Sequence, residues 1–134
     1  MYRSFMESYS VSNVKIKDEL PFNYLAVINP KDSSCIYTLH NLHFKIKDAN
    51  IIRLLSSDDL EQPANSKEIT SLQVTHKLNI QHKLDYTELA TIKNTENLFN
   101  DNYIILLPGG SLVIETEKSI NKVDLSIDWS IEAF

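Results

Sequence analysis

Four histidines are the residues of this chain whose chemistry most invites a functional interpretation, because imidazole binds metals and acts as a base near neutral pH. His76 and His82 lie six positions apart in a stretch of alternating apolar and polar residues. In an extended strand this spacing separates them by about 20 Å. His40 and His43 differ by an odd number of positions, so a strand would point them to opposite faces. We expect neither pair to share a metal ion.

A metal site that joins His40 to His76 or His82 across two sheets remains geometrically open, as in cupin barrels, where histidine and carboxylate ligands from several strands meet. The His-x-His pair of cupins is absent. Single buried histidines satisfied by other polar groups are the commoner case. We therefore expect no metal, and a cupin-like metal-dependent protein is the third hypothesis for function.

Other reactive residue types also lack the partners that chemistry requires. Cys35 is the only cysteine, so it can form no intrachain disulfide, and at the start of a strand it reads as a small buried hydrophobe. Residues 108–111, Pro-Gly-Gly-Ser, lack the lysine and helix of a phosphate-binding loop and are expected to form a turn with positive φ at both glycines. We expect no catalytic residue, no cofactor and no enzymatic activity.

Asp124, Asp128 and Glu132 recur every four residues near the C-terminus. In a strand they would lie about 13 Å apart, too far for a catalytic pair of carboxylates. We interpret them as a solvated face, and the alternative is a surface that forms salt bridges with a basic neighbour.

The alternation of residues 72–86 is the clearest structural signal in the chain. Even positions carry apolar residues or histidine and odd positions carry only polar residues, which is the period of a half-buried strand. Fifteen residues would span about 50 Å, which is long for one straight strand in a domain of this size. We expect a bulge or corner near Asn79 that carries the chain from one sheet to another.

Further strands follow from similar patterns. Residues 123–133 alternate again, with Val123, Leu125, Ile127, Trp129 and Ile131 on the apolar face. In residues 34–47, Ile36, Leu42, Phe44 and Ile46 share one parity. Shorter apolar runs at 24–28, 51–55, 103–107 and 112–116 add strands, and the last two flank the turn at 108–111 as a hairpin or tight corner. Polar segments 58–66 and 94–102 are expected to be surface loops.

These patterns predict an all-β protein, an antiparallel β-sandwich with a jelly-roll-like arrangement of about eight strands. The length of 134 residues suits one core. We expect residues 1–20 to form an N-terminal arm or edge strand and residues 21–134 to form a single sandwich domain.

Charge and composition argue against two classes of partner, nucleic acids and membranes. The net charge of −5 and the lack of a clustered basic segment argue against nucleic acid, since Lys15 with Lys17, and Lys45 with Lys47, each alternate with isoleucine as on the wet face of a strand. No segment approaches the roughly 20 apolar residues that span a bilayer, and no Asn-x-Ser/Thr acceptor occurs. We expect no membrane association and a protein made in cytoplasm.

The order of features resembles small virion proteins of tailed bacteriophages. An Asn-Pro at 29–30 precedes a long alternating strand and polar loops, then the segment 107–114, Leu-Pro-Gly-Gly-Ser-Leu-Val-Ile, and a closing strand with Leu-Ser-Ile-Asp-Trp at 125–129. The resemblance covers about residues 24–133. It implies a jelly-roll or sandwich subunit of a neck, collar, tail or capsid-decoration position, with ring or trimer symmetry and no catalytic residues.

The leading hypothesis is therefore a non-enzymatic structural protein of a virion, assembled in the host cytoplasm as a homo-oligomer with other virion proteins. The alternative is a carbohydrate- or receptor-binding β-sandwich module in which exposed aromatic rings stack on sugars. Its candidate residues are Tyr24, Tyr37, Phe99 and Tyr103. The same rings could instead fill the core or line a subunit contact.

Overall fold

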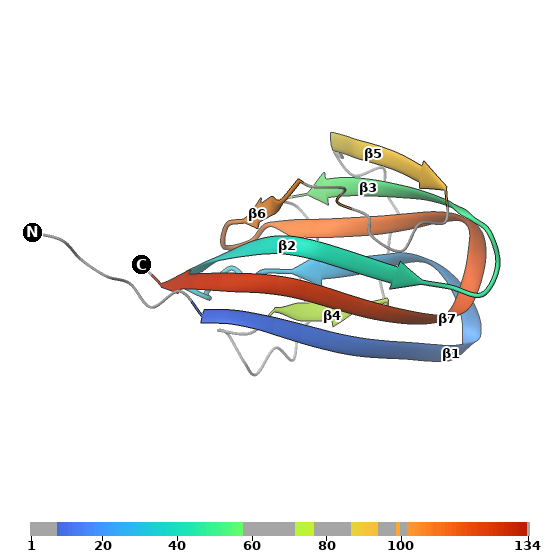
Figure 1. Ribbon diagram of the computed structural model, residues 1–134, viewed down its shortest axis with the longest axis horizontal. Coiled ribbons are helices and arrows are strands. Elements are labelled where there is room, and N and C mark those ends of the chain that lie inside the picture. Colours follow the sequence, from blue (N-terminus) through green and yellow to red (C-terminus); the bar gives the residue numbers. More distant parts are fainter. Residues whose placement is uncertain (1–7, 58–71, 77–86, 94–98, 100–101, 134) are drawn as a thin grey trace, which may run out of the picture.

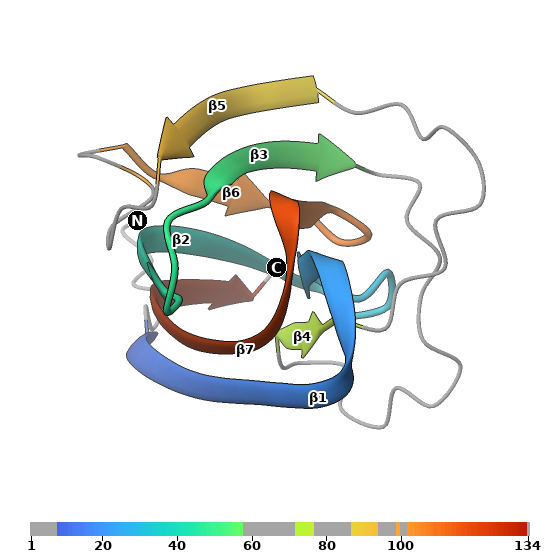
Figure 2. The ribbon, with the colours of Figure 1, turned by 90° about the vertical axis from the view of Figure 1, so that its right-hand side faces the viewer.

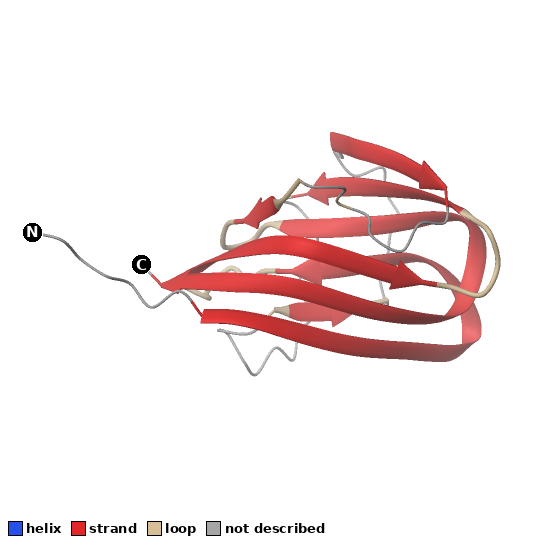
Figure 3. Ribbon diagram, viewed as in Figure 1, coloured by secondary structure: helices blue, strands red, loops and turns tan. Residues whose placement is uncertain are grey.

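The computed structural model describes residues 8–57, 72–76, 87–93, 99 and 102–133, which contain strands, turns and loops but no helix (Figures 1 and 3). The strands are β1 (Ser8–Ile28), β2 (Cys35–Lys45), β3 (Ile51–Ser57), β4 (Gln73–Thr75), β5 (Thr87–Lys93), β6 (Ile104–Leu106) and β7 (Ser111–Ala133). All their pairings are antiparallel. The all-β antiparallel prediction is confirmed, and no membrane-spanning helix is found in the described part of the chain.

The two longest strands, β1 and β7, organise the fold. They pair along nearly their whole length, from Ser8 opposite Ile131 to Ile28 opposite Ser111. Strands of 21 and 23 residues would each extend about 70 Å if straight, so they must bend to form a compact core. The register between them shifts from Lys17 to Tyr24, and Figure 2 shows both ribbons curling through this region.

The bend divides the sheet into two layers. The first half of β1 and the second half of β7 lie in one layer with β2 and β6, in the order β1–β7–β2–β6. The other halves lie in the second layer, in the order β4–β1–β7–β3–β5. A long antiparallel pair that folds over and carries flanking strands in both layers is sandwich-like and consistent with a jelly roll.

The main core lies between the layers and follows from the alternation of each strand. In β7, Val123, Leu125 and Ile127 are buried, and Trp129 and Ile131 pack against them, as the sequence pattern predicts. The other fully buried large residues of this core come from β1, β2, β3 and the start of β7: Leu25, Tyr37, Leu39, Leu42, Phe44, Ile52, Leu112 and Ile114. Both layers thus share this apolar interior, and the second layer adds a smaller cluster of Ala26, Ile28, Leu55 and Val113.

A bulge in β2 corrects the predicted orientation of that strand. Leu39 and Leu42 are both fully buried although they are three residues apart, because the register with β7 shifts between Leu39 and Asn41. Ile36 therefore does not share the inward parity of Leu42 and is only half-buried. The extra residue also places His40 on the outer face, the same face as His43, so the predicted opposite orientation is wrong.

Residues 107–110 form the corner between the layers rather than a hairpin. β6 pairs with β2 in the first layer, whereas β7 begins in the second layer beside β1 and β3. The amide of Gly110 donates to the carbonyl of Leu107 at 2.8 Å, and Gly109 has a φ of 88°. Gly109 therefore needs the freedom of glycine, but Gly110 does not adopt the positive φ that was expected.

Several sequence predictions concern residues outside the described ranges. Leu72 and Val74 pack against the core, and the predicted strand at 72–86 is described only as the short β4. The expected bend near Asn79 and the histidine at 82 lie outside the described residues, as do loop 58–66 and most of 94–102. β5 was not predicted as a separate strand. β1 continues through position 20, where an arm or edge strand was expected to end.

Candidate functional site

The outer face of the first layer carries rows of polar side chains whose positions follow from the strand register. Lys15 of β1 lies opposite Asp124 of β7, which lies opposite Lys45 of β2. One row along, residues 13, 126 and 43 align in the same way and contribute an asparagine, a serine and a histidine. The inward neighbours in these strands fill the core, so these residues must face outward.

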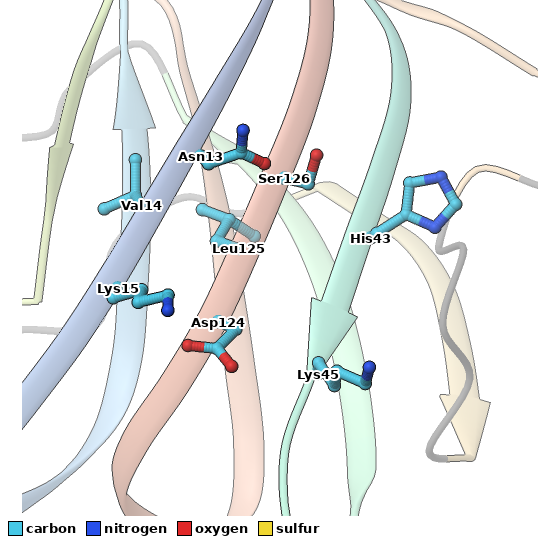
Figure 4. Close-up of a pocket in the computed structure, with 8 residues that line it drawn as sticks. All are labelled: Asn13, Val14, Lys15, His43, Lys45, Asp124, Leu125 and Ser126. Carbon is cyan, nitrogen blue, oxygen red and sulfur yellow. The ribbon is translucent and has the colours of Figure 1, made fainter.

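The rows enclose a trough of about 340 Å³, which we call the outer trough. Lys15, His43 and Lys45 on the flanking strands are longer than Asp124 and Ser126 of β7 between them. Figure 4 shows Lys15 and Lys45 on either side of Asp124. Its polar lining residues are Asn13, Lys15, His43, Lys45, Asp124 and Ser126.

Farther along the same face, polar side chains form hydrogen bonds with one another. The amide of Asn41 donates to the carboxylate of Asp128 at 3.0 Å, and Nε2 of His40 lies 2.9 Å from the hydroxyl of Ser130. Asp124, Asp128 and Glu132 are all half-buried on this face. Asp128 is therefore hydrogen-bonded to a neutral neighbour on its own surface and has no basic partner among the described residues.

The opposite edge of this layer carries an apolar strip, Tyr103, Ile105 and Leu107, on and beside β6. Their side chains are 63%, 52% and 58% exposed. Among the described residues, β6 forms a ladder with β2 alone. Ile104 and Leu106 point inward instead, and the strip is the outward parity of one short edge strand.

The four predicted aromatic residues lie in different environments. Tyr37 is fully buried and packs edge-on against the ring of Trp129, with ring centroids 5.4 Å apart. Burial raises the pKa of Tyr37 to about 12, with a smaller contribution from nearby Cys35. Phe99 is 4% exposed and also belongs to the core. Neither ring can stack on a sugar at the surface.

Tyr24 and Tyr103 are the candidates that reach the surface. The hydroxyl of Tyr24 donates to Glu115 at 2.7 Å, and Arg53 forms a salt bridge with the same carboxylate at 3.0 Å, so Tyr24 is tied to its neighbours on the second layer. Tyr103 lies in the apolar strip of the first layer. The structure therefore does not bring the four aromatic residues together.

His76 pairs with Asp18, with Nε2 and Oδ2 2.6 Å apart, and its ring lies 4.6 Å from that of Phe22. This contact joins the end of β4 to the bend of β1. Beside it lies a hollow of about 300 Å³. One carboxylate and one imidazole, both partly exposed, form a hydrogen-bonded structural contact but lack the nucleophile or third group of a catalytic site.

Metal ligands are not assembled in the residues that the structure describes. Within those ranges no three histidine, cysteine or acidic side chains lie close enough to hold an ion. His40 and His43 share a face, but each has a different setting: His40 contacts Ser130 and His43 lines the outer trough. Cys35 is buried.

The sequence did not reveal the outer trough, because Lys15 and Lys45 belong to two different lysine pairs, on strands that are distant in the chain and separated by β7. Each pair alone looks like a solvated strand face. The apolar strip had a visible signal, since Tyr103, Ile105 and Leu107 alternate within one run, but the inward or outward direction depended on the pairing with β2.

Comparison of the chain with protein-family models finds no match, and comparisons with curated proteins and with solved structures find none either. Its function must be argued from its own residues and fold.

Proposed function

We propose that this protein is a non-enzymatic structural subunit that assembles through protein–protein contacts into a symmetric oligomer. The observation that carries the proposal is the apolar strip of Tyr103, Ile105 and Leu107 on edge strand β6. Contiguous exposed apolar residues mark interaction surfaces more often than solitary ones do. Association with a second surface would remove these side chains from water.

The edge of β6 is only three residues long, but it carries no charge that would discourage pairing. Natural edge strands carry lysines, inward-pointing charges or bulges that discourage contact with another chain. Residues 102–111 contain no charged residue. If two copies paired about a two-fold axis through Ile105, each Tyr103 would face Leu107 of the other copy. Such a contact is self-complementary, as a symmetric interface requires.

We propose further that this subunit belongs to the virion of a tailed bacteriophage. Its partners would be other virion proteins, and it would assemble in the host cytoplasm. Its support is the resemblance of residues 24–133 to small virion proteins of that class, together with a two-layered antiparallel fold of the kind that viral capsid domains use. A subunit of this type acts through repeated contacts and needs no catalytic cluster.

The test replaces an apolar strip residue with lysine and measures mass in solution by sedimentation. Ile105→Lys and Leu107→Lys are expected to convert the oligomer to a monomer, because a buried unpaired charge is strongly unfavourable. Leu20→Lys is the matched control, since Leu20 is 74% exposed at the bend, far from β6 along the chain. Equal masses for all three variants and the natural chain would refute a β6 interface.

A further inference from the structure

Five exposed lysines lie on β1, β2 and β7 of the first layer or just after β2, and we call them the lysine patch: Lys15, Lys17, Lys45, Lys47 and Lys122. Lys17 and Lys122 are direct cross-strand partners of β1 and β7. Facing side chains in such a pair have Cβ atoms about 5 Å apart, and like charges there destabilise a sheet. Lys47 and Lys122 both line a second hollow of about 240 Å³ near the bend.

The lysine patch is positive on a negative molecule. Asp124 is the acidic residue between its two sides, and in the second hollow Lys118 and Asp48 offset each other. The five lysines and Asp124 together carry +4, so the rest of a chain with net charge −5 carries −9. In the described part of the chain, no carboxylate lies within ion-pair distance of these ammonium groups. An anionic ligand would relieve their repulsion.

The outer trough at the centre of this patch adds both donors and an acceptor. Lys15 and Lys45 supply ammonium donors on either side of Asp124, whose carboxylate accepts hydrogen bonds only. Asn13, His43 and Ser126 supply further polar groups at the next row. A matching ligand carries an anionic group and several hydroxyls.

We propose that the outer trough binds an acidic saccharide, a chain of sugar units that bear carboxylates. Carboxylates of the sugar chain contact Lys15 and Lys45, and a ring hydroxyl between them donates to Asp124. A nucleic acid fits less well, because the trough offers no aromatic or arginine side chain for base stacking. The site is independent of the apolar strip on β6.

Calorimetric titration of the full chain with hexagalacturonate tests the site, with maltohexaose as the neutral control and an oligothymidylate hexamer as the nucleic-acid control. We expect saturable binding of hexagalacturonate alone. Lys15→Ala and Lys45→Ala should each weaken it about fivefold or more, as for a partly exposed charged hydrogen bond. Lys31→Ala, which removes an exposed lysine outside the trough, should leave it unchanged.

Asp124→Ala, which removes both the acceptor and the negative charge, separates a saccharide site from a bare positive patch. If Asp124 accepts a sugar hydroxyl, the variant binds hexagalacturonate more weakly, whereas a patch that acts only through its charge binds more tightly once the negative charge is gone. Tighter binding, equal binding of oligothymidylate, or no saturable binding would overturn the proposal. Self-association that is lost in Lys15→Ala without saccharide binding would assign the patch to a second copy and overturn it too.

Discussion

Asn29 is the residue on which the corner between the layers depends most. Its side-chain amide donates to the carbonyls of Cys35 and Leu106, both at 2.9 Å, and its side-chain oxygen accepts from the hydroxyl of Ser33 at 2.6 Å. Its backbone amide donates a hydrogen bond to the carbonyl of Gly110, and its backbone carbonyl accepts one from the amide of Gly109. Asn29 is fully buried, so water cannot replace these bonds. One side chain thus joins the loop after β1 to the end of β6.

Asn29→Ala is expected to lower the free energy of unfolding by about 3 to 5 kcal/mol, since each buried group left without a partner costs about 1 to 3 kcal/mol. Urea unfolding followed by tryptophan fluorescence measures the loss. Asn121→Ala, at an exposed position near the bend, should change stability by less than about 0.5 kcal/mol. A similarly small effect of Asn29→Ala would show that the hydrogen bonds of the Asn29 side chain contribute little to stability.

The titration of Tyr37 should make the stability of the fold depend on pH in the alkaline range. Its pKa is raised to about 12 in the folded chain by burial, against the usual value of about 10 when unfolded. Between these values the unfolded chain releases a proton that the folded chain keeps, so stability falls as pH rises through this window and is unaffected below it.

The melting temperature should therefore fall between pH 10 and pH 12, and Tyr37→Phe should reduce that fall. Tyr103→Phe, at an exposed position, is the control and should retain it. Equal slopes for the two variants in a thermal scan at several pH values would contradict a stabilising neutral phenol at Tyr37.

At the scale of elements, the bulge in β2 decides which residues face the core. Leu39 and Leu42 both point inward only because His40 and Asn41 together occupy the place of one residue opposite β7. Without the extra residue, the strand would alternate regularly from Cys35 to Lys45. The bulge also explains why the sequence pattern placed Ile36 with the core residues. Every second residue faces the same side of a strand on each side of a bulge, but this rule does not hold across the bulge.

Deletion of His40 should leave the inward residues of β2 in place and cost about 1 kcal/mol through the lost contact with Ser130. Deletion of Thr38 should move the fully buried Leu39 to the outer face and cost at least about 2 to 5 kcal/mol. Chemical denaturation of both variants measures the difference. Comparable losses would mean that the bulge does not set the register.

At the scale of the whole molecule, alternation predicted the fold class and the inward face of the last strand, because period two directly reports a half-buried sheet. It did not predict that the two halves of β1 and β7 lie in different layers, since the bends depend on tertiary packing. The lysine patch could not be predicted for the same reason. Lys17 and Lys122 become neighbours only because β1 pairs with a segment of β7 about a hundred residues away.

The first layer therefore presents two unlike surfaces, an apolar strip at the β6 edge and a positive trough on the β1–β7–β2 face. We propose the strip for assembly and the trough for ligand binding. Mutations at one should leave the other intact, because sites without shared contacts behave additively. A subunit built in this way can hold its neighbours and still expose the trough.

The most direct test of the assembly proposal is the mass of the natural chain in solution, measured by light scattering over a wide range of concentration. The proposal predicts a discrete mass that is an integral multiple of the chain mass and that persists at high salt, because the strip is uncharged. A monomer at every concentration and salt would contradict it.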